Sequence, residues 1–371
     1  MKILITIVII ILTLLVSFLA LANFLKKRDQ AKNIEDVIKF IKTNPDKCSF
    51  SFIDNGETIL SMNAYRVMPL ASTYKIILAI SSIYAIRNKE LTLEEVVDIK
   101  DIDKFFFKNT DGNAHLEWIR RENIGTKCSM KQIISGMMKY SSNACTEYLY
   151  SRINKKFITA VLKDLNLNNQ SEIFPVTSAM LIPSYLYSEE KLRKKNILNR
   201  IKDMSEIEYH SLATKILNKI KANEVDNMIK NLNVLSNVKI QKEFTKRLPS
   251  STTLEYARLM FMLGSSNLFN KSEKLLLDEI MSNLSSDGES RFWYKGGSTM
   301  FVLTSAIFKQ GKKGDYAFSF FVEDFSRLEI IWLKNVYLEF LRSFLEDSPF
   351  REKVINELQD NNKLYKEKIT R

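Results

Sequence analysis

Three short polar motifs carry residue types that acyl-transfer chemistry requires. The first is Ser72-Thr73-Tyr74-Lys75, at the start of a long apolar run. If that run is a buried helix, one helical turn places the Lys75 amine beside the Ser72 hydroxyl. Burial lowers the pKa of a lysine, so Lys75 could accept the hydroxyl proton. The free N–H groups of the helix N-terminus would stabilise a developing oxyanion.

Two further motifs follow along the chain, Ser141-Ser142-Asn143 and Lys295-Gly296-Gly297-Ser298. Taken singly, each of the three motifs has an ordinary explanation: a capped helix with a solvated lysine, a polar turn between helices, and a glycine-containing strand end. Their order and their contexts, a strand–turn–helix, a helix–helix loop and a C-terminal strand, indicate one active site instead.

Strand-like segments stand at both ends of the sequence. Residues 48–53 and 58–62 flank Asn55-Gly56, a pair that tolerates the positive φ angles of a two-residue hairpin turn. The C-terminal strands are expected at residues 292–295, 300–308 and 316–322, with a hairpin turn at 311–314.

The middle of the chain has helical periodicity, from about residue 91 to residue 165. Ser129 and Gln132 form a capping-box pattern ahead of a helix that ends near Tyr140, and the next helix begins around Ala144. The second motif therefore lies in a tight connection between two helices.

Other helices are expected before and after this region. A linker and short helix cover about residues 32–42, and residues 187–247 have helical spacing with many charged residues, as in an inserted segment with a solvated face. Another capped helix begins at Thr252, and a long amphipathic helix covers about residues 335–345.

This order of elements predicts the α+β class. We expect an α/β/α sandwich: an antiparallel sheet built from both chain ends, flanked by helices, with an inserted all-helical lobe. The predicted parts are a signal peptide or membrane anchor at 1–22, a linker and N-terminal helix at 23–47, the main domain at 48–346 with its insertion at about 187–247, and a charged tail at 347–371.

The N-terminus predicts export. An apolar run covers residues 3–25, and the Ala-Leu-Ala at 20–22 is the small-x-small pattern that signal peptidase accepts, so Asn23 would begin the mature chain. The run is also long enough to span a bilayer uncleaved. Basic residues at 26–28 favour a cytoplasmic flank, which conflicts with export. Cleavage and anchoring both stay open.

The formal net charge is +12. It fits either a Lys-rich chain solvated over its surface or a chain attracted to anionic envelope polymers or a membrane surface, and no nucleic-acid-binding module accompanies it. The odd number of cysteines, Cys48, Cys128 and Cys145, leaves at least one thiol unpaired within a monomer. Export permits one disulfide, whose pairing the sequence does not choose. No Cys/His spacing suggests zinc, and we expect no metal or cofactor.

The three motifs resemble those of class A β-lactamases and their penicillin-binding relatives, whose set is Ser-x-x-Lys, Ser-Asp-Asn and Lys-Thr-Gly. The Arg-Val-Met-Pro-Leu-Ala before Ser72 also resembles the family. Two middle residues differ, with Ser142 in place of Asp and Gly296 in place of Thr, whereas the first and last residues, which carry the contacts, are retained. The resemblance covers about residues 48–340 apart from the insertion and implies a serine hydrolase domain.

The resemblance also implies roles for particular residues. Ser72 would attack a carbonyl, Lys75 would accept its proton, and Ser141 would relay a proton to the leaving nitrogen. The implied substrate contacts are Asn143 with an amide, Lys295 with a carboxylate, Gly297 allowing close approach along its strand, and the N–H groups of Ser298 and Ser72 as an oxyanion hole, typically worth about 3 kcal/mol per donor.

One family feature is missing. Class A β-lactamases activate the deacylating water with the glutamate of a Glu-x-x-Leu-Asn motif, which residues 168–178 lack. Glu172 is the nearest candidate, against the alternative of a solvated loop carboxylate. A general base contributes roughly 10²–10⁴-fold, so acylation without fast deacylation is expected. His115 and His210 are expected to be structural or exposed and to offer no Ser-His-Asp scheme.

Three functions stay open on this sequence. The first is a β-lactamase-like hydrolase acting on a β-lactam or a related amide. The second keeps the nucleophile but acts on a cell-wall peptide or an ester, as a D,D-peptidase does, with slow β-lactam turnover. The third is a non-catalytic envelope binding protein. We expect a monomer located in the periplasm or cell envelope, with a small-molecule or peptidoglycan-derived substrate and membrane association through the N-terminal segment.

Overall fold

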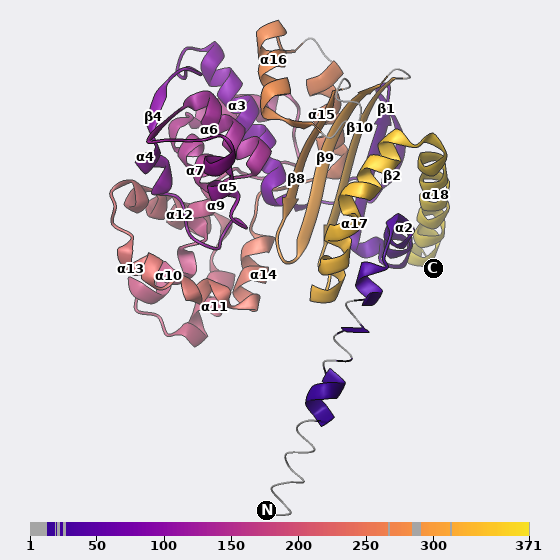
Figure 1. Cartoon of the computed structure of the whole chain (residues 1–371), viewed down its shortest axis with the longest axis horizontal. Coiled ribbons are helices and arrows are strands. Elements are labelled where there is room, and N and C mark those ends of the chain that lie inside the picture. Colours follow the sequence, from indigo (N-terminus) through magenta and orange to yellow (C-terminus); the bar gives the residue numbers. More distant parts are fainter. Residues whose placement is uncertain are drawn as a thin grey trace, which may run out of the picture. The chain divides into compact units, whose positions relative to one another are not determined.

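The computed structural model describes residues 13–18, 20, 23–24, 27–265, 268–283, 291–311 and 314–370 (Figure 1). The chain divides into two compact units, one formed by Met1–Asp46 with Phe325–Arg371 and the other by Lys47–Asp324. The second unit holds all the predicted site residues. It ends at Asp324, whereas the predicted main domain ends at residue 346.

The second unit is built on a six-stranded antiparallel sheet with the strand order β2-β1-β10-β9-β8-β7 (Figure 1). Its strands are β1 (Cys48–Asp54), β2 (Glu57–Met62), β7 (Ser282–Asn283), β8 (Phe292–Ser298), β9 (Val302–Gly311) and β10 (Gly314–Glu323). Because β1 pairs with β10 along its whole length, the two ends of the unit meet in the middle of one sheet. The predicted fold class is confirmed.

Both predicted hairpins join paired strands. Asn55 and Gly56 have φ angles of 49° and 90°, the left-handed pair that a two-residue hairpin turn between right-twisted strands requires. In the second hairpin Gly311 lies opposite Gly314, and the turn residues 312 and 313 lie outside the described residues. The strand β9 begins later than predicted, because Thr299 Oγ1 accepts hydrogen bonds from the N–H groups of residues 301 and 302 and makes a turn there.

Two helices form the apolar centre of this unit. The helix α15 (Thr253–Ser265) packs on β1, β9 and β10, and Thr252 Oγ1 caps its start as predicted. The helix α3 (Lys75–Arg87) is buried on nearly every side. A 3₁₀ turn, η2 (Ala71–Tyr74), precedes it. The expected α-helix therefore begins at Lys75 and not at Ser72, which belongs to the tighter turn.

The helical lobe lies beside the β8 side of the sheet (Figure 1). The predicted capping box at Ser129 is confirmed. The lobe comprises α4 (Ile99–Asp103), α5 (Ala114–Arg121), α6 (Met130–Ser135), the π-helical turn η3 (Gly136–Tyr140), α7 (Asn143–Arg152), α8 (Lys155–Asp164), α9 (Val176–Ala179) and α10 (Ile182–Ser188), with the short strand pairs β3 (Met68–Pro69) with β6 (Ser250–Ser251) and β4 (Val96–Asp98) with β5 (Lys127–Ser129).

The predicted helical insertion is confirmed as helical. It contains α11 (Lys194–Asp203), α12 (Glu206–Lys221), α13 (Asp226–Lys230), the 3₁₀ turn η4 (Leu232–Ser236) and α14 (Val238–Lys246). The helix α12 packs on α9, so the insertion covers the loop that carries residues 166–180. A further helix, α16 (Lys271–Ile280), follows α15.

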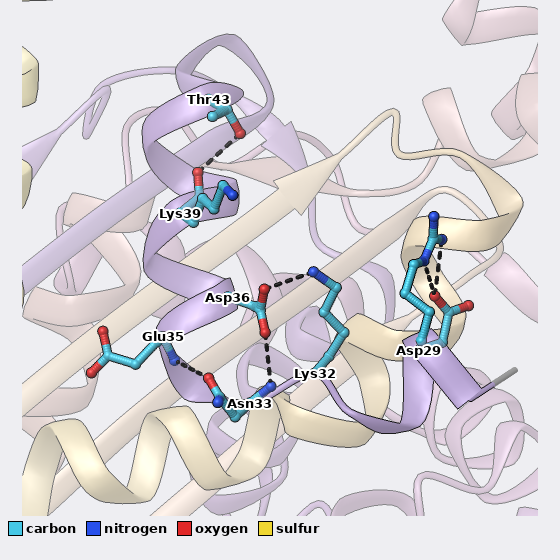
Figure 2. A network of polar contacts seen from close by, with 8 residues as sticks. Asp29, Lys32, Asn33, Glu35, Asp36, Lys39 and Thr43 are labelled. Carbon is cyan, nitrogen blue, oxygen red and sulfur yellow. Dashed lines mark hydrogen bonds and ion pairs between the residues drawn. The ribbon is translucent and has the colours of Figure 1, made fainter. Parts of the chain in front are cut away.

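The first unit contains the helices α2 (Ile34–Thr43), α17 (Arg327–Glu346) and α18 (Ser348–Thr370), which pack on one another. Figure 2 shows the start of α2, where Asn33 and Asp36 form a capping box and Asp36 also binds Lys32 Nζ at 2.6 Å. The predicted last helix is longer than expected. Residues 348–370, most of the predicted charged tail, form the helix α18, in which Phe350, Val354 and Leu358 are buried.

The predicted leader or anchor at residues 1–22 lies largely outside the described residues. Among the helices that are described, none combines the length and the apolar composition that crossing a membrane requires. Cys48, Cys128 and Cys145 are all described and buried, and Cys128 and Cys145 are free thiols.

Candidate active site

The strand β9 holds the turn that carries Ser72. Thr304 Oγ1 donates to the Leu70 carbonyl at 2.7 Å and lies 2.8 Å from Thr73 Oγ1. Ala71, directly before Ser72, has a φ angle of 45°. A non-glycine residue adopts this conformation only where its surroundings impose it, and such residues gather at functional sites. The turn is therefore held in a strained shape that leaves Ser72 partly accessible.

Lys75 is buried, with 1% of its surface exposed. Its Nζ donates to the Ser141 carbonyl at 2.8 Å and to Asn143 Oδ1 at 3.0 Å, and lies 3.4 Å from Ser141 Oγ. Burial lowers the pKa of Lys75 to about 7, and negative groups, Asp111 first, oppose this shift only in part. The neutral amine is therefore well populated at pH 7, as predicted from the position of Lys75 on a buried helix.

Ser141 lies between two lysines. Lys295 Nζ donates to Ser141 Oγ at 3.0 Å and to the Gly296 carbonyl at 3.3 Å. Burial, together with the positive charge of Lys75, lowers the pKa of Lys295 well below its usual range. Two ammonium groups beside one hydroxyl repel each other, so the arrangement favours a neutral amine on at least one of them.

The second motif forms the predicted tight connection between helices. Ser141 has a left-handed backbone, with a φ angle of 66°, directly after η3. Ser142 caps α7 by accepting a hydrogen bond from the Cys145 N–H, and α7 begins at Asn143. The sharp change of direction at Ser141 brings both Ser141 and Asn143 to Lys75.

The third motif lies at the end of β8, where one edge of this strand has no strand partner among the described residues. The strand β9 pairs with β8 along its length, whereas β7 pairs only with Trp293 and Tyr294. Within the described residues, 295–298 therefore have a strand partner on one side only. Ser298 is exposed there. This short edge could accept an extended substrate backbone.

Both glycines of the third motif are explained by close contacts. A Cβ added at Gly297 would lie 2.6 Å from the Ser72 nitrogen and 2.5 Å from the Leu70 carbonyl oxygen. The missing side chain thus allows β8 to lie against the turn of the nucleophile, a reason different from the expected close approach of substrate. A Cβ added at Gly296 would lie 2.0 Å from the Tyr294 hydroxyl oxygen, so Tyr294 occupies the space that a threonine there would need.

Glu147 belongs to the site but was not predicted. Its carboxylate is buried and accepts hydrogen bonds from the N–H groups of Thr177 at 3.1 Å and Ser178 at 2.7 Å. Burial raises the pKa of Glu147, and the hydrogen bonds from Ser178 and Thr177 oppose this shift only in part. In its ionised form Glu147 favours protonation of Lys75. Glu147 follows Asn143 by four residues on α7, so the two side chains share one helix face. That spacing was the available sequence signal.

A cavity of about 200 Å³ adjoins the third motif. Its walls come from the end of β8, the segment before α5, the 166–180 loop region and the insertion, and all the lining residues are uncharged. The lining residues are Asn109, Thr110, Met180, Leu235, Gln241, Phe244, Thr245, Ser298, Thr299 and Met300. An engineered cavity of about 150 Å³ holds one benzene molecule, so this one has room for a neutral group of roughly one ring.

Glu172 and His210 are paired with each other away from the three motifs. The Glu172 carboxylate binds Lys155 Nζ at 2.5 Å and His210 Nδ1 at 3.1 Å, and the His210 ring stacks on Phe174 with ring centroids 4.1 Å apart. These contacts tie the 166–180 loop to α12. His115 is fully buried and contacts Ser142, in keeping with the structural role expected of it.

A family model described as "Beta-lactamase enzyme family" matches residues 29–288, which is more than half of the chain. No curated protein matches the sequence.

Several solved structures share the fold at low sequence identity. One is a class A β-lactamase from Bacteroides cellulosilyticus DSM 14838, with a TM-score of 0.51 and 12% identity over 89% of this chain and 98% of that one. A β-lactamase from Chitinophaga pinensis DSM 2588 has a TM-score of 0.50 and 12% identity over 80% and 94% of the two chains. A β-lactamase from Sphaerobacter thermophilus DSM 20745 has a TM-score of 0.50 and 13% identity over 87% and 94%.

Proposed function

Because the chain belongs to the β-lactamase enzyme family, we propose that it is an exported serine hydrolase that forms an acyl-enzyme on Ser72. The substrate class is a β-lactam or a related amide. The apolar N-terminal segment supports export and a location outside the cytoplasm. The observation that carries the proposal is the buried Lys75 amine, which is held by two acceptors beside a hydroxyl that Lys295 also contacts.

The hydrogen-bond partners of Lys75 suit a base. A neutral amine has two N–H donors and one lone pair, whereas an ammonium group has three donors and no lone pair. The Ser141 carbonyl and Asn143 Oδ1 occupy two donors. Ser141 Oγ, at 3.4 Å, is the third neighbour of Nζ. In the neutral form the lone pair would accept the proton of Ser72, which lies in the 3₁₀ turn directly before the helix that begins at Lys75.

Acylation then follows from the positions of the three hydroxyl and amine groups. The Ser72 oxygen bonds to the substrate carbonyl carbon while its proton passes to Lys75. The developing oxyanion would accept from the N–H groups of Ser72 and Ser298, which lie on segments in close contact. The C–N bond breaks as the Ser141 hydroxyl gives its proton to the leaving nitrogen, and Ser141 regains a proton from the protonated Lys75.

Substrate binding is assigned to the edge of β8 and the neighbouring cavity. Lys295 would donate hydrogen bonds to a substrate carboxylate, whose negative charge would in turn raise the lowered pKa of the amine. Asn143 would donate its amide N–H₂ to a substrate carbonyl. A neutral substituent of the substrate would enter the uncharged cavity beside Ser298. These roles agree with those that the resemblance implies.

Slow deacylation is part of the proposal, because both candidate carboxylates are occupied. Each oxygen of Glu147 already accepts a backbone N–H, and Glu172 is bound to Lys155 and His210. A water molecule at the acyl-enzyme would therefore lack the base that typically contributes roughly 10²–10⁴-fold. This favours, as a second candidate, a penicillin-binding D,D-peptidase or esterase that turns over β-lactams slowly.

The two candidates differ in how they respond to two β-lactam probes. Nitrocefin hydrolysis measures turnover, and a fluorescent penicillin measures the accumulation of acyl-enzyme. We expect stoichiometric labelling with little nitrocefin turnover, and we expect Ser72→Ala to remove the label. Fast nitrocefin turnover would favour the β-lactamase, and wild-type protein left unlabelled by penicillins and by active esters would refute both.

A further inference from the structure

A serine, a histidine and an aspartate form one hydrogen-bonded chain beneath the second motif. Ser142 Oγ lies 2.9 Å from His115 Nδ1, and His115 Nε2 lies 2.9 Å from Asp103 Oδ1. Ser142 and His115 are fully buried, whereas 46% of the Asp103 side chain is exposed. These hydrogen bonds therefore connect the surface of α4 with the loop that carries Ser141 and Asn143.

These three hydrogen-bonded residues do not form a second nucleophilic site. Ser142 is inaccessible to a substrate, and its Oγ is already the cap of α7, accepting from the Cys145 N–H at 3.1 Å. The Ser-His-Asp connectivity has to serve another purpose.

One neutral tautomer of His115 satisfies both of its hydrogen bonds. Since Ser142 Oγ accepts from a backbone N–H, its own proton can be directed to His115 Nδ1. His115 is then the neutral tautomer with the N–H on Nε2, which donates to Asp103. The imidazole lies between the rings of Phe106 and Trp118, at centroid distances of 5.0 and 5.4 Å, so its plane is held in the direction that both bonds require.

Ser142 lies between Ser141 and Asn143 in the sequence, so its position affects the positions of both. Ser141 has a left-handed backbone and holds the hydroxyl between Lys75 and Lys295, while Asn143 holds Lys75 through Oδ1. A shift of Ser142 would move all of these contacts together. In geometry-dependent catalysis a displacement of about 1 Å can cost on the order of 100-fold in rate.

We propose that His115 is a positioning residue for acylation, which fixes Ser142 through Nδ1 and is itself oriented by Asp103. The proposal rests on the proposed acylation of Ser72.

Two substitutions by amide side chains test the roles of the two ring nitrogens of His115 separately. In His115→Asn the side-chain amide takes the place of Nδ1, so the bond to Ser142 can be kept while the bond to Asp103 is lost. In His115→Gln the amide reaches the place of Nε2, so Asp103 keeps a partner while Ser142 loses its own. Asp103→Asn keeps an acceptor at the exposed end and serves as a mild control.

The rate of Ser72 acylation by a penicillin, at saturating and at low concentration, is measured on the full chain of each variant. We expect His115→Gln to lose on the order of 100-fold, mainly in the maximal acylation rate, and His115→Asn and Asp103→Asn to lose about tenfold or less. Equal rates for wild type and His115→Gln would overturn the proposal, as would an equal loss in His115→Asn and His115→Gln.

A spectroscopic measurement stays informative if a variant folds poorly or if wild type proves inactive. The chain has only two histidines, so ¹⁵N-histidine labelling of the full chain gives two imidazole signals, and His210→Asn assigns them. We expect His115 to be the neutral tautomer protonated on Nε2, with an Nδ1 signal that shifts in Ser142→Ala. A proton on Nδ1, or no shift in Ser142→Ala, would overturn the inference. An inactive wild type with the expected tautomer would refute only the proposed function.

Discussion

Lys75 and Ser141 define the chemistry at the scale of single residues. Lys75 is buried, yet its Nζ has three oxygen partners, the Ser141 carbonyl, Asn143 Oδ1 and, at 3.4 Å, Ser141 Oγ, and no direct carboxylate partner among its hydrogen bonds in the described residues. Burial lowers the pKa of the amine, and the hydrogen bonds keep the amine oriented. An exposed lysine at the same position would stay protonated and could not act as a base at neutral pH.

The first prediction concerns the pH dependence of acylation. Because the pKa of Lys75 is lowered to about 7, the neutral amine, which is the base, increases as the pH rises. The acylation rate should increase about tenfold per pH unit below pH 7 and level off above it. Stopped-flow measurement of penicillin acylation from pH 5.5 to 8.5 tests this.

Lys75→Arg is the matched control, because a guanidinium stays protonated over this whole range. It should lower the acylation rate by roughly 10²–10⁴-fold and remove the pH-dependent rise. A wild-type rate that does not change with pH, or a variant that retains the rise, would contradict the role of Lys75.

The second prediction concerns Glu172. The carboxylate is engaged by Lys155 first and by His210, and both lower its pKa. Glu172→Gln should therefore change the lifetime of the acyl-enzyme less than about threefold, far below the roughly 10²–10⁴-fold effect of losing a general base. Decay of the penicillin adduct is followed by intact mass. A lifetime lengthened a hundredfold would identify Glu172 as the deacylating base.

Sequence reasoning identifies the motif residues for a physical reason, since their types and order are rare in combination. It misses Glu147, because a glutamate within a helix is ordinarily solvated. Only the tertiary packing of α7 against the 166–180 loop, where two backbone N–H groups face the carboxylate, makes it a buried partner.

At the scale of elements, the contact between β8 and η2 brings the third motif to the nucleophile. Leu70, Ser72 and Gly297 lie so close that a Cβ at Gly297 would meet two backbone atoms. Backbone atoms cannot swing away as a flexible side chain can, so a larger residue must push the strand from the turn.

The third prediction follows from this contact. Gly297→Ala should slow acylation by on the order of 100-fold, because a displacement of about 1 Å separates the two oxyanion-hole donors. Gly125→Ala is the control, since a Cβ there would meet nothing within 4 Å. Acylation kinetics and thermal melting are measured on both. Wild-type acylation by Gly297→Ala would contradict the close approach.

Local elements are predicted well where local chemistry decides them. The Asn55-Gly56 turn and the Ser129 capping box each follow from short-range hydrogen bonding and φ preference. The 3₁₀ start of α3 and the helix at 348–370 are missed. Contacts with β9 impose the 3₁₀ turn. Packing against α2 and α17 buries the described apolar residues of α18.

At the scale of the whole molecule, a sheet built from both ends of the second unit brings together parts of the chain that are far apart in sequence. Ser72 stands at the start of the central helix, Ser141 in the helical lobe and Lys295 on a late strand, yet Lys75 and Lys295 both reach the hydroxyl of Ser141. One antiparallel sheet built from both ends was predicted from the positions of the strand-like segments, whereas the order of its strands was not predicted. The distances between the motifs were not, because they depend on how helices and sheet pack.

The central claim is that Ser72 forms an acyl-enzyme and that the acyl group is released from it slowly. The most direct test is mass spectrometry of the full chain after incubation with benzylpenicillin, followed by peptide mapping and by a time course after removal of the free drug. We predict one covalent adduct, on the peptide containing Ser72, that persists well beyond the mixing time and is absent from Ser72→Ala. An adduct on another residue, or none with wild-type protein, would contradict it.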